Sequence, residues 1–212
     1  MVIAIDGPAG AGKSTVARGV AAALGFTYLD SGAMYRSVAL AALRAGADPD
    51  DAAAVTELSG RLEVTLDGPF VLLADEDVSA AIRTPEVTSA SSRVSVHPGV
   101  REAMVDRQRE LIAAGRYVAE GRDIGTVVSP DSPLKIYLSA NDAERARRRA
   151  AQTGAPVEAV LSAQSERDRR DSEREHGALR AADDAVEIDT SELRIDEVVE
   201  RVVELARERG LA

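Results

Sequence analysis

Residues 7–14 combine small, flexible residues with one cation and one hydroxyl. They read GPAGAGKS, which fits the spacing G-x-x-x-x-G-K-[S/T]. The glycines let backbone N–H groups converge on one anion, the ammonium of Lys13 neutralises charge on it, and the Ser14 hydroxyl is a ligand for Mg²⁺. Together these groups predict a loop that binds the phosphates of a nucleotide.

The segments on either side of this loop fit the context that it needs. Apolar residues of high β-propensity from Val2 to Asp6 indicate a strand, and the Ala- and Val-rich residues from Ser14 to Leu24 indicate a helix. A helix that begins beside the loop turns its positive dipole end toward the phosphates. Because a phosphate loop identifies a superfamily and not a reaction, the second substrate must be inferred from other segments.

One such segment follows the apolar run at 26–29. Ser31 is predicted to cap a helix over residues 31–45, and Arg36 lies one to two turns into that helix. A guanidinium there could form a two-pronged contact with an acceptor phosphate. The alternative is an ordinary capped helix that carries a surface arginine.

A second segment, Arg122 and Asp123, lies between glycines after the predicted strand 117–120. Ligands of parallel sheets bind at the carboxyl ends of the strands, which favours a ligand contact for this pair. The alternative is a salt bridge inside the loop. Neither His97 nor His176 is expected to be catalytic, and the acidic stretch 75–77 is expected to form a solvated turn.

Short apolar segments alternate with helical patterns along most of the chain. This alternation predicts an α/β fold with a five-stranded parallel sheet covered on both faces. In the middle, 61–67 and 70–74 read as a hairpin within a small inserted subdomain at about 57–93. The expected strands are 2–6, 26–29, 117–120, 134–138 and 185–188; the later helices are 99–114, one from Asn141, 156–175 and 195–209, where Gly210 ends the last.

Arginine is concentrated between residues 141 and 180, in two predicted helices. Nine of the chain's arginines lie there together with eight acidic residues, so a salt-bridged pair of surface helices is the favoured interpretation for most of them. Catalysts of phosphoryl transfer, however, position two anions, exclude water and stabilise charge on the moving group. An arginine-rich flap over the phosphate loop would serve that purpose.

The composition excludes several classes of function. The chain has 212 residues, a net charge of -10, no cysteine and two histidines, which excludes disulfides, iron–sulfur clusters and thiol nucleophiles. The acidic balance argues against binding to nucleic-acid backbones, and the apolar runs are shorter than a membrane span. We therefore expect a soluble, cytoplasmic monomer with no nucleic-acid or membrane partner.

Seven segments together resemble the bacterial cytidylate kinases, which are nucleoside monophosphate (NMP) kinases. They cover nearly the whole chain and read IAIDGPAGAGKST at 3–15, LDSGAMYR at 29–36, DVSAAIRTPEV at 77–87, HPGVR at 97–101, EGRDIGTVV at 120–128, ERDRRDSER at 166–174 and VVERV at 198–202. The resemblance implies a P-loop NTPase-type three-layer core (1–30, 99–140, 181–212), an NMP-binding region at 31–98 with the inserted mixed β/α subdomain, and an arginine-rich helical lid at 141–180.

The resemblance also implies the reaction and the residues that perform it. The γ-phosphate of ATP would pass to CMP or dCMP in the presence of Mg²⁺, with Lys13, Arg122 and Arg174 catalytic and Ser14 on the metal. ATP would be bound by Gly7, Pro8, Ala9, Gly10, Ala11, Gly12, Lys13, Ser14, Thr15 and Arg145, the last on the adenine, with Arg148 and Arg149 as further lid contacts. CMP would be bound through its phosphate by Ser31, Arg36, Arg122 and Arg174, through its base by Ser92, Arg101 and Asp123, and near its sugar by Tyr35, Arg167 and Asp171.

Two alternatives remain at this point. One is a kinase with the same loop and lid but another acceptor, such as UMP or shikimate. The other is a GTP-binding switch, which is disfavoured because the sequence has no N-K-x-D segment and such switches need no second anion site. The role of Glu120, where some relatives have Asp, is left open.

Overall fold

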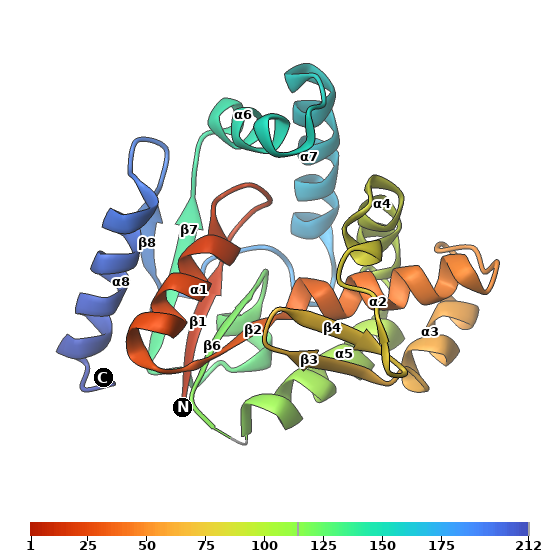
Figure 1. Cartoon of the computed structure of the whole chain (residues 1–212), viewed down its shortest axis with the longest axis horizontal. Helices are drawn as coiled ribbons and strands as arrows, with labels where there is room; N and C mark the ends of the chain where they lie inside the picture. Colours follow the sequence, from red (N-terminus) through yellow and green to blue (C-terminus); the bar gives the residue numbers. More distant parts are fainter. Residues whose placement is uncertain (114, 212) are drawn as a thin grey trace. The chain divides into compact units, whose positions relative to one another are not determined.

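The structure is a computed structural model that describes residues 1–113 and 115–211, and it divides into two compact units (Figure 1). Unit 1 comprises Met1–Leu29 and Ile112–Ala212, and unit 2 comprises Asp30–Leu111. The sequence-based division assigned residues 99–140 to the core. Residues 99–111 instead group with unit 2, because Val100 and Met104 pack into its hydrophobic cluster.

Unit 1 is built on a five-stranded sheet, as predicted. The strand order is β2-β6-β1-β7-β8, and the pairs β1–β6, β1–β7 and β7–β8 are parallel. The second strand begins and ends one residue later than expected, at 27 and 30. The strands are β1 (Val2–Asp6), β2 (Thr27–Asp30), β6 (Tyr117–Gly121), β7 (Leu134–Ser139) and β8 (Val186–Asp189).

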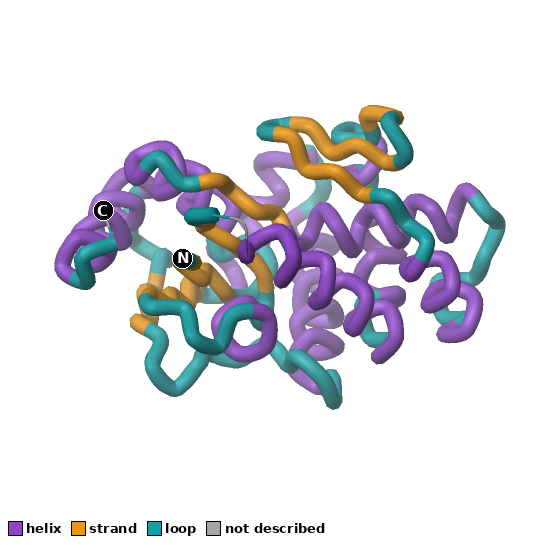
Figure 2. The backbone as a smooth tube through the Cα atoms, turned by 90° about the horizontal axis from the view of Figure 1, so that it is seen from below, coloured by secondary structure: helices purple, strands orange, loops and turns teal. Residues whose placement is uncertain are grey.

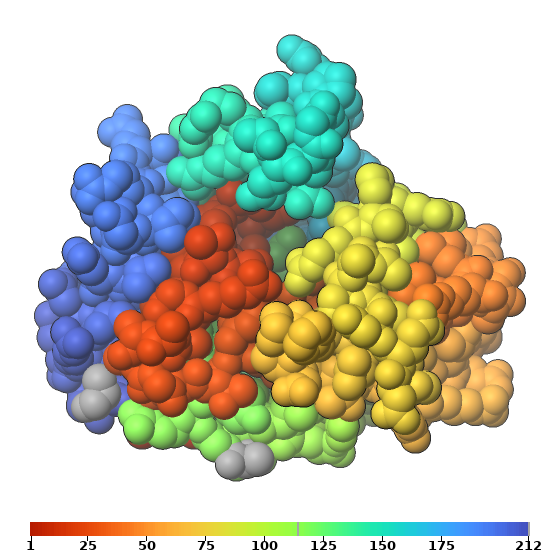
Figure 3. Space-filling view, viewed as in Figure 1, coloured from red at the N-terminus to blue at the C-terminus, as the bar shows by residue number. Residues whose placement is uncertain are grey.

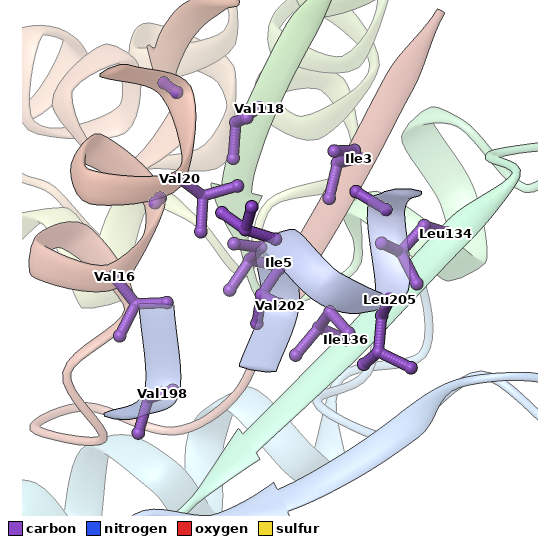
Figure 4. Close-up of a cluster of buried hydrophobic side chains, with 14 of the residues drawn as sticks. Ile3, Ile5, Val16, Val20, Val118, Leu134, Ile136, Val198, Val202 and Leu205 are labelled. Atoms are coloured by element: carbon purple, nitrogen blue, oxygen red, sulfur yellow. The ribbon is translucent and has the colours of Figure 1, made fainter. Parts of the chain in front are cut away.

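The hydrophobic core of unit 1 lies between this sheet and two helices, α1 (Lys13–Leu24) and α8 (Ile195–Glu208). Every residue of β1 is buried, because the strand lies in the middle of the sheet. Gly210 has a φ of 68° just after α8, a conformation that favours glycine and ends the helix as predicted. Figure 4 shows the side chains that α1, α8 and the strands bring together: Ile3, Ile5, Val16, Val20, Val118, Leu134, Ile136, Val198, Val202 and Leu205.

Two arginine-rich helices, α6 (Asp142–Thr153) and α7 (Val157–Glu173), lie in the segment predicted to be a lid and pack against each other. The side chain of Asn141 accepts a hydrogen bond from the backbone N–H of Glu144 at 2.9 Å. This contact satisfies one of the open donors at the start of α6, so Asn141 caps the helix that was predicted to begin there.

Unit 2 contains a small antiparallel sheet of order β3-β4-β5, whose strands are orange in Figure 2. The prediction of a hairpin was incomplete, since a third strand pairs with β4. The expected solvated turn at 75–77 was partly right: all three residues are exposed and the chain reverses at Ala74 and Asp75, both with positive φ, but residues 76 and 77 form β5. The strands are β3 (Val64–Asp67), β4 (Phe70–Leu73) and β5 (Glu76–Asp77).

The helices of unit 2 were only partly predicted. Two of them, α3 and α4, are short, and they contain Ser and Thr, which favour caps and turns over helix interiors. Ala114, the last residue of the helix predicted over 99–114, lies outside the described residues. The helices are α2 (Ser31–Arg44), α3 (Ala52–Gly60), a 3₁₀ turn (Ala81–Arg83), α4 (Pro85–Val94) and α5 (Pro98–Ala113).

Among residues 1–113 and 115–211, no helix combines the length and the apolar character needed to cross a membrane.

Candidate active site

The predicted phosphate loop joins the end of β1 to the start of α1, as its sequence requires. Gly7 has a φ of 146°, and a Cβ atom there would lie 2.1 Å from the carbonyl oxygen of Leu138 at the end of β7. Gly12 caps α1 with a φ of 90° and accepts from the N–H groups of Thr15 and Val16. Only glycine fits the close approach at position 7, so the loop runs directly along the carboxyl end of the sheet.

Lys13 is buried at the first position of α1, and its Nζ donates to the carbonyl oxygen of Pro8 at 2.8 Å. Burial, and then the positive charge of Arg122, lower the pKa of Lys13 to about 7, although Glu120 and Asp6 act in the opposite direction. Phosphate oxygens placed beside Lys13 would restore its proton. The carboxylates of Glu120 and Asp6 thus balance the charge of Lys13 only in part.

Ser14 and Thr15 lie at the exposed beginning of α1. A hydroxyl in this position can serve as one ligand of a hydrated Mg²⁺ whose other ligands are water and nucleotide phosphates. Within the part of the chain that the structure describes, no group of three or more His, Cys, Asp or Glu side chains could hold a metal ion.

Asp171 of α7 lies at the centre of an arginine cluster. Its carboxylate accepts from Nε of Arg122 at 2.9 Å and lies 3.6 Å from Nη1 of Arg174 and 4.0 Å from Nε of Arg167. Burial alone would raise the pKa of Asp171, but the charges of Arg122, Arg167 and Arg174 outweigh burial, so its pKa is below the usual value.

The same geometry answers the question about a salt bridge near Arg122. An ion pair does exist, and it joins Arg122 to Asp171 of α7, which is distant in sequence. The pKa of Arg122 is raised, because the charge of Asp171 and its hydrogen bond outweigh the effect of burial. Arg122 therefore forms one cationic cluster with Arg167 and Arg174, which lie in a different sequence segment, 166–174.

The loop that carries Arg122 and Asp123 is fixed by Asp6. The Asp6 carboxylate accepts from the backbone N–H groups of Ile124 and Gly125, at 2.8 and 2.7 Å, at the start of a π-helical turn over Ile124–Val128. Burial raises the pKa of Asp6 to about 6, although these two hydrogen bonds oppose the shift. Asp123 itself is buried directly before this turn.

Glu120 is buried near the end of β6 and accepts a hydrogen bond from the hydroxyl of Tyr28. The Arg18 guanidinium lies 5.0 Å from the centre of the Tyr28 ring. Glu120 therefore has a structural partner in the same unit, and its charge favours protonation of Lys13.

Arg145, predicted to contact adenine, is buried at the first turn of α6. Its guanidinium donates to the carbonyl oxygens of Ala9, at 2.7 Å, and Ala140, at 3.2 Å, and it pairs with Asp142 and Asp168. Figure 3 shows the lid helices, in turquoise, beside the phosphate-loop segment, in red. Arg145 thus connects the lid with the phosphate loop.

The two other lid arginines differ from each other. Arg148 donates to Glu144 and to both oxygens of Thr190, whose hydroxyl in turn donates to the carbonyl of Ala11 in the phosphate loop. Arg149 lies on the outside of α6, where it contacts Gln152. Arg148 is thereby linked to the phosphate loop through Thr190.

The remaining predicted residues belong to unit 2. The predicted cap of α2 was wrong by one position, because Asp30 is the cap and accepts from the N–H of Ala33 at 2.8 Å, while Ser31 is the first helical residue. Arg36 donates to the same Asp30 carboxylate at 2.9 Å, and Arg83 lies 3.8 Å from it. Arg36 is therefore neither exposed nor an isolated surface residue.

Ser92 and Arg101 are buried in α4 and α5, and the Arg101 guanidinium lies 5.8 Å from the centre of the Tyr35 ring. This places Tyr35 and Arg101, predicted to contact the sugar and the base, side by side. Within unit 1 the structure brings together Lys13, Arg122, Arg167, Asp171 and Arg174.

Sequence reasoning missed three acidic residues that organise these groups: Asp6, Asp30 and Asp168. Asp6 directly precedes the phosphate loop, Asp30 precedes Ser31, and Asp168 lies inside the segment ERDRRDSER. The available signal was a carboxylate at the end of a strand or inside an arginine-rich motif. That signal does not show which arginine or backbone N–H forms a hydrogen bond with the carboxylate.

Comparisons with known proteins show the family and the fold of this chain. The family model described as cytidylate kinase matches residues 3–208. The chain is 48% identical over 216 residues to a cytidylate kinase of Solibacter usitatus, covering 99% of this chain and 93% of the relative. It is 49% identical to one of Mycobacterium leprae, covering 99% and 97%. A shikimate kinase structure from Bacteroides thetaiotaomicron shares the fold, with a TM-score of 0.51 at 13% identity and 98% coverage of both chains.

Proposed function

The chain belongs to the cytidylate kinase family, and we propose that it transfers the γ-phosphate of ATP to CMP or dCMP, giving ADP and CDP or dCDP. The observation that carries this proposal is the family match over nearly the whole chain. It is supported by the buried Lys13 in a phosphate loop of the same unit as the arginine cluster of Arg122, Arg167 and Arg174.

ATP would bind along the phosphate loop through backbone N–H groups and Lys13. The positive dipole end of α1 and the ammonium of Lys13 favour the β- and γ-phosphates. Lys13 lacks a carboxylate hydrogen-bond partner among those described, since its Nζ donates to a carbonyl oxygen. Stabilisation of charge on the transferred group is the main task of a kinase site, and Lys13 would supply it.

We include Mg²⁺ in the proposal, held by the Ser14 hydroxyl and by the nucleotide. When bound, the metal would neutralise negative charge on the nucleotide phosphates. The exposed hydroxyl at the first turn of α1 fits a cation that keeps most of its water ligands.

Residues predicted to contact CMP are found in each unit, where carboxylates of that same unit orient them. Unit 1 supplies Arg122, Arg167 and Arg174, which already hold a carboxylate, that of Asp171, and are therefore oriented for an anion. In unit 2, Arg36 is oriented by Asp30. A guanidinium held in this way loses less side-chain entropy when it binds a phosphate.

Asp123 is the proposed determinant of the base. A carboxylate accepts a hydrogen bond from the exocyclic amine of cytosine and is repelled by the carbonyl that uracil carries instead. Its backbone is held by the contacts of Asp6 to the two following residues. Asp123→Ala should therefore raise the Michaelis constant for CMP at least about tenfold and leave that for ATP nearly unchanged; equal weakening of both would remove Asp123 from the base pocket.

The direct test is an assay of ADP formation from ATP and Mg²⁺ with CMP, dCMP, UMP, AMP, GMP or shikimate as acceptor. We expect CMP and dCMP to stimulate the rate and shikimate to have no effect. A rate with CMP and dCMP no higher than that without acceptor would refute the proposal. Strong stimulation by UMP alone would favour the alternative acceptor. A cytoplasmic location and a monomeric state remain predictions from the sequence.

A further inference from the structure

Asp168 of the lid helix α7 contacts the phosphate loop directly. Its Oδ1 accepts from the backbone N–H of Ala9 at 3.3 Å, and its Oδ2 accepts from Nη1 of Arg145. The same Nη1 donates to the carbonyl oxygen of Ala9 at 2.7 Å. The three residues thus form a closed ring that satisfies both backbone groups of Ala9.

The packing around this ring leaves no space for a side chain at Gly10 of the loop. A Cβ atom on Gly10 would lie 2.8 Å from Nε2 of Gln164 and 3.0 Å from Cβ of Arg145, and Gly10 has a φ of 80°. Gln164 of α7 also donates to the carbonyl oxygen of Arg145. The tip of the phosphate loop and both lid helices are therefore in close contact, and the contact is specific for glycine.

Arg145 has two carboxylate partners, and they differ in burial. The side chain of Asp142 is 68% exposed, whereas those of Asp168 and Arg145 are 16% and 6% exposed. Exposed ion pairs contribute little, because water and salt screen them. Charge-assisted hydrogen bonds with restricted access to water contribute more. Asp168, and not Asp142, is therefore the partner that orients Arg145.

We propose that Asp168 is a positioning residue for ATP, which acts by holding Arg145 and the Ala9–Gly10 tip of the phosphate loop in their binding arrangement. This inference rests on the proposed function, since it assumes that the loop binds ATP. Without the Asp168 carboxylate, the N–H of Ala9 loses its acceptor and Arg145 loses the bond that directs it to the loop. The affinity for ATP then falls, whereas groups outside this ring that bind the acceptor keep their geometry.

The test compares Asp168→Asn with the matched control Asp142→Asn. Both variants remove one carboxylate partner of Arg145, but only the first breaks the ring. Calorimetry measures the dissociation constant of ATP with Mg²⁺ in the absence of acceptor, and kinetics give the Michaelis constants for ATP and CMP. For Asp168→Asn we expect the dissociation constant of ATP to increase about tenfold, which corresponds to about 1.4 kcal/mol. The Michaelis constant for CMP should change less than about twofold. For Asp142→Asn we expect the dissociation constant of ATP and the Michaelis constant for CMP each to change less than about twofold.

A second variant separates positioning from a general loss of structure. In a protein that already carries Arg145→Lys, Asp168→Asn should weaken the binding of ATP much less than it does in the parent protein, because the two residues act through the same ring. Unchanged ATP affinity in Asp168→Asn would overturn the inference. So would tighter binding, which would mean that the carboxylate competes with phosphate, and so would an equal loss for ATP and CMP. A parent protein that binds ATP but does not phosphorylate CMP would refute the proposed function and leave this binding test intact.

Discussion

Two regions of unit 1 each bury an aspartate, and they treat its charge in opposite ways. Beside the phosphate loop, Asp6 accepts from two backbone N–H groups, and its pKa is raised to about 6 by burial. In the arginine cluster, Asp171 is also buried, but the charges around it hold its pKa below the usual value. The residue type and the burial are alike, so the neighbours decide the charge.

The comparison shows how the two regions are prepared for anions. In the phosphate-loop region, the positive charge of the backbone N–H dipoles and of Lys13 is only partly balanced by negative charge. Burial lowers the pKa of Lys13 to about 7. The arginine cluster has permanent charges and an internal counter-ion in Asp171. The first region would gain stability when phosphate arrives, whereas the second is already stable without it.

The largest expected effect comes from removing the one cation of the phosphate loop. Lys13→Ala should lower turnover by about three orders of magnitude or more, because Lys13 acts on charge that develops during transfer. The fold should persist, because burial already disfavours the charged form of this side chain. Steady-state kinetics and the unfolding temperature measure the two effects, and Lys13→Met keeps most of the buried stem as a control.

This variant also tests the comparison itself. If Lys13→Ala failed to fold, the loop would be held together by its lysine, and the contrast with the arginine cluster would be lost. A melting temperature of Lys13→Ala equal to or above that of the parent protein would strengthen the contrast between the phosphate-loop region and the arginine cluster.

The next largest effect is expected in the arginine cluster and concerns stability. Asp171→Ala leaves Arg122, Arg167 and Arg174 buried or half-buried without their common carboxylate, which should cost about 3–5 kcal/mol of unfolding free energy. Urea unfolding at neutral pH measures this loss. The control is Glu173→Gln on the same helix. The side chain of Glu173 is 62% exposed, so its replacement should lower the free energy of unfolding by less than about 1 kcal/mol.

The smallest effect is a difference in pH dependence between Asp6 and Asp171. The pKa of Asp6 rises from 3.8 to about 6 on folding, so the folded protein binds more protons between these values. The contribution of Asp6 to stability is therefore full below the unfolded value and is lost as the pH rises through about 6. Asp171, with its lowered pKa, contributes above the unfolded value and loses its contribution as the pH falls.

Two measurements reveal this difference. The amide resonance of Gly125, which donates to Asp6, should titrate with a midpoint near the pKa of Asp6, about 6, and Asp6→Asn should abolish the transition. The difference in unfolding free energy between Asp6→Asn and the parent protein should change by roughly 2 kcal/mol between pH 4 and pH 7. A Gly125 amide that shows no transition above pH 4 would place Asp6 in the same class as Asp171.

Much of the fold could be predicted from the sequence, because it depends on local patterns. The five strands, the glycine-rich loop, the cap at Asn141 and the stop at Gly210 are each specified by a few adjacent residues. The third strand of the small sheet was not predicted, because two polar residues carry no strand pattern and pair only through β4.

The candidate site was predicted less completely than the fold. Lys13 and Arg122 were identified by motif, but the cap of α2 fell one residue away from its true position at Asp30. Both Asp30 and Ser31 are good capping residues, and the sequence offers no means of choosing between them. The choice follows from the strand geometry, since Asp30 ends β2 and leads directly into the helix.

The sequence by itself determined which groups exist: a phosphate loop with one lysine, a set of arginines, and the family to which they belong. Only the tertiary structure decided how these groups are paired. Asp171 is 49 residues from Arg122, and Asp168 is 159 residues from Ala9. Such pairings, and the pKa shifts that depend on burial, arise from packing between distant segments, which no local pattern of residues encodes.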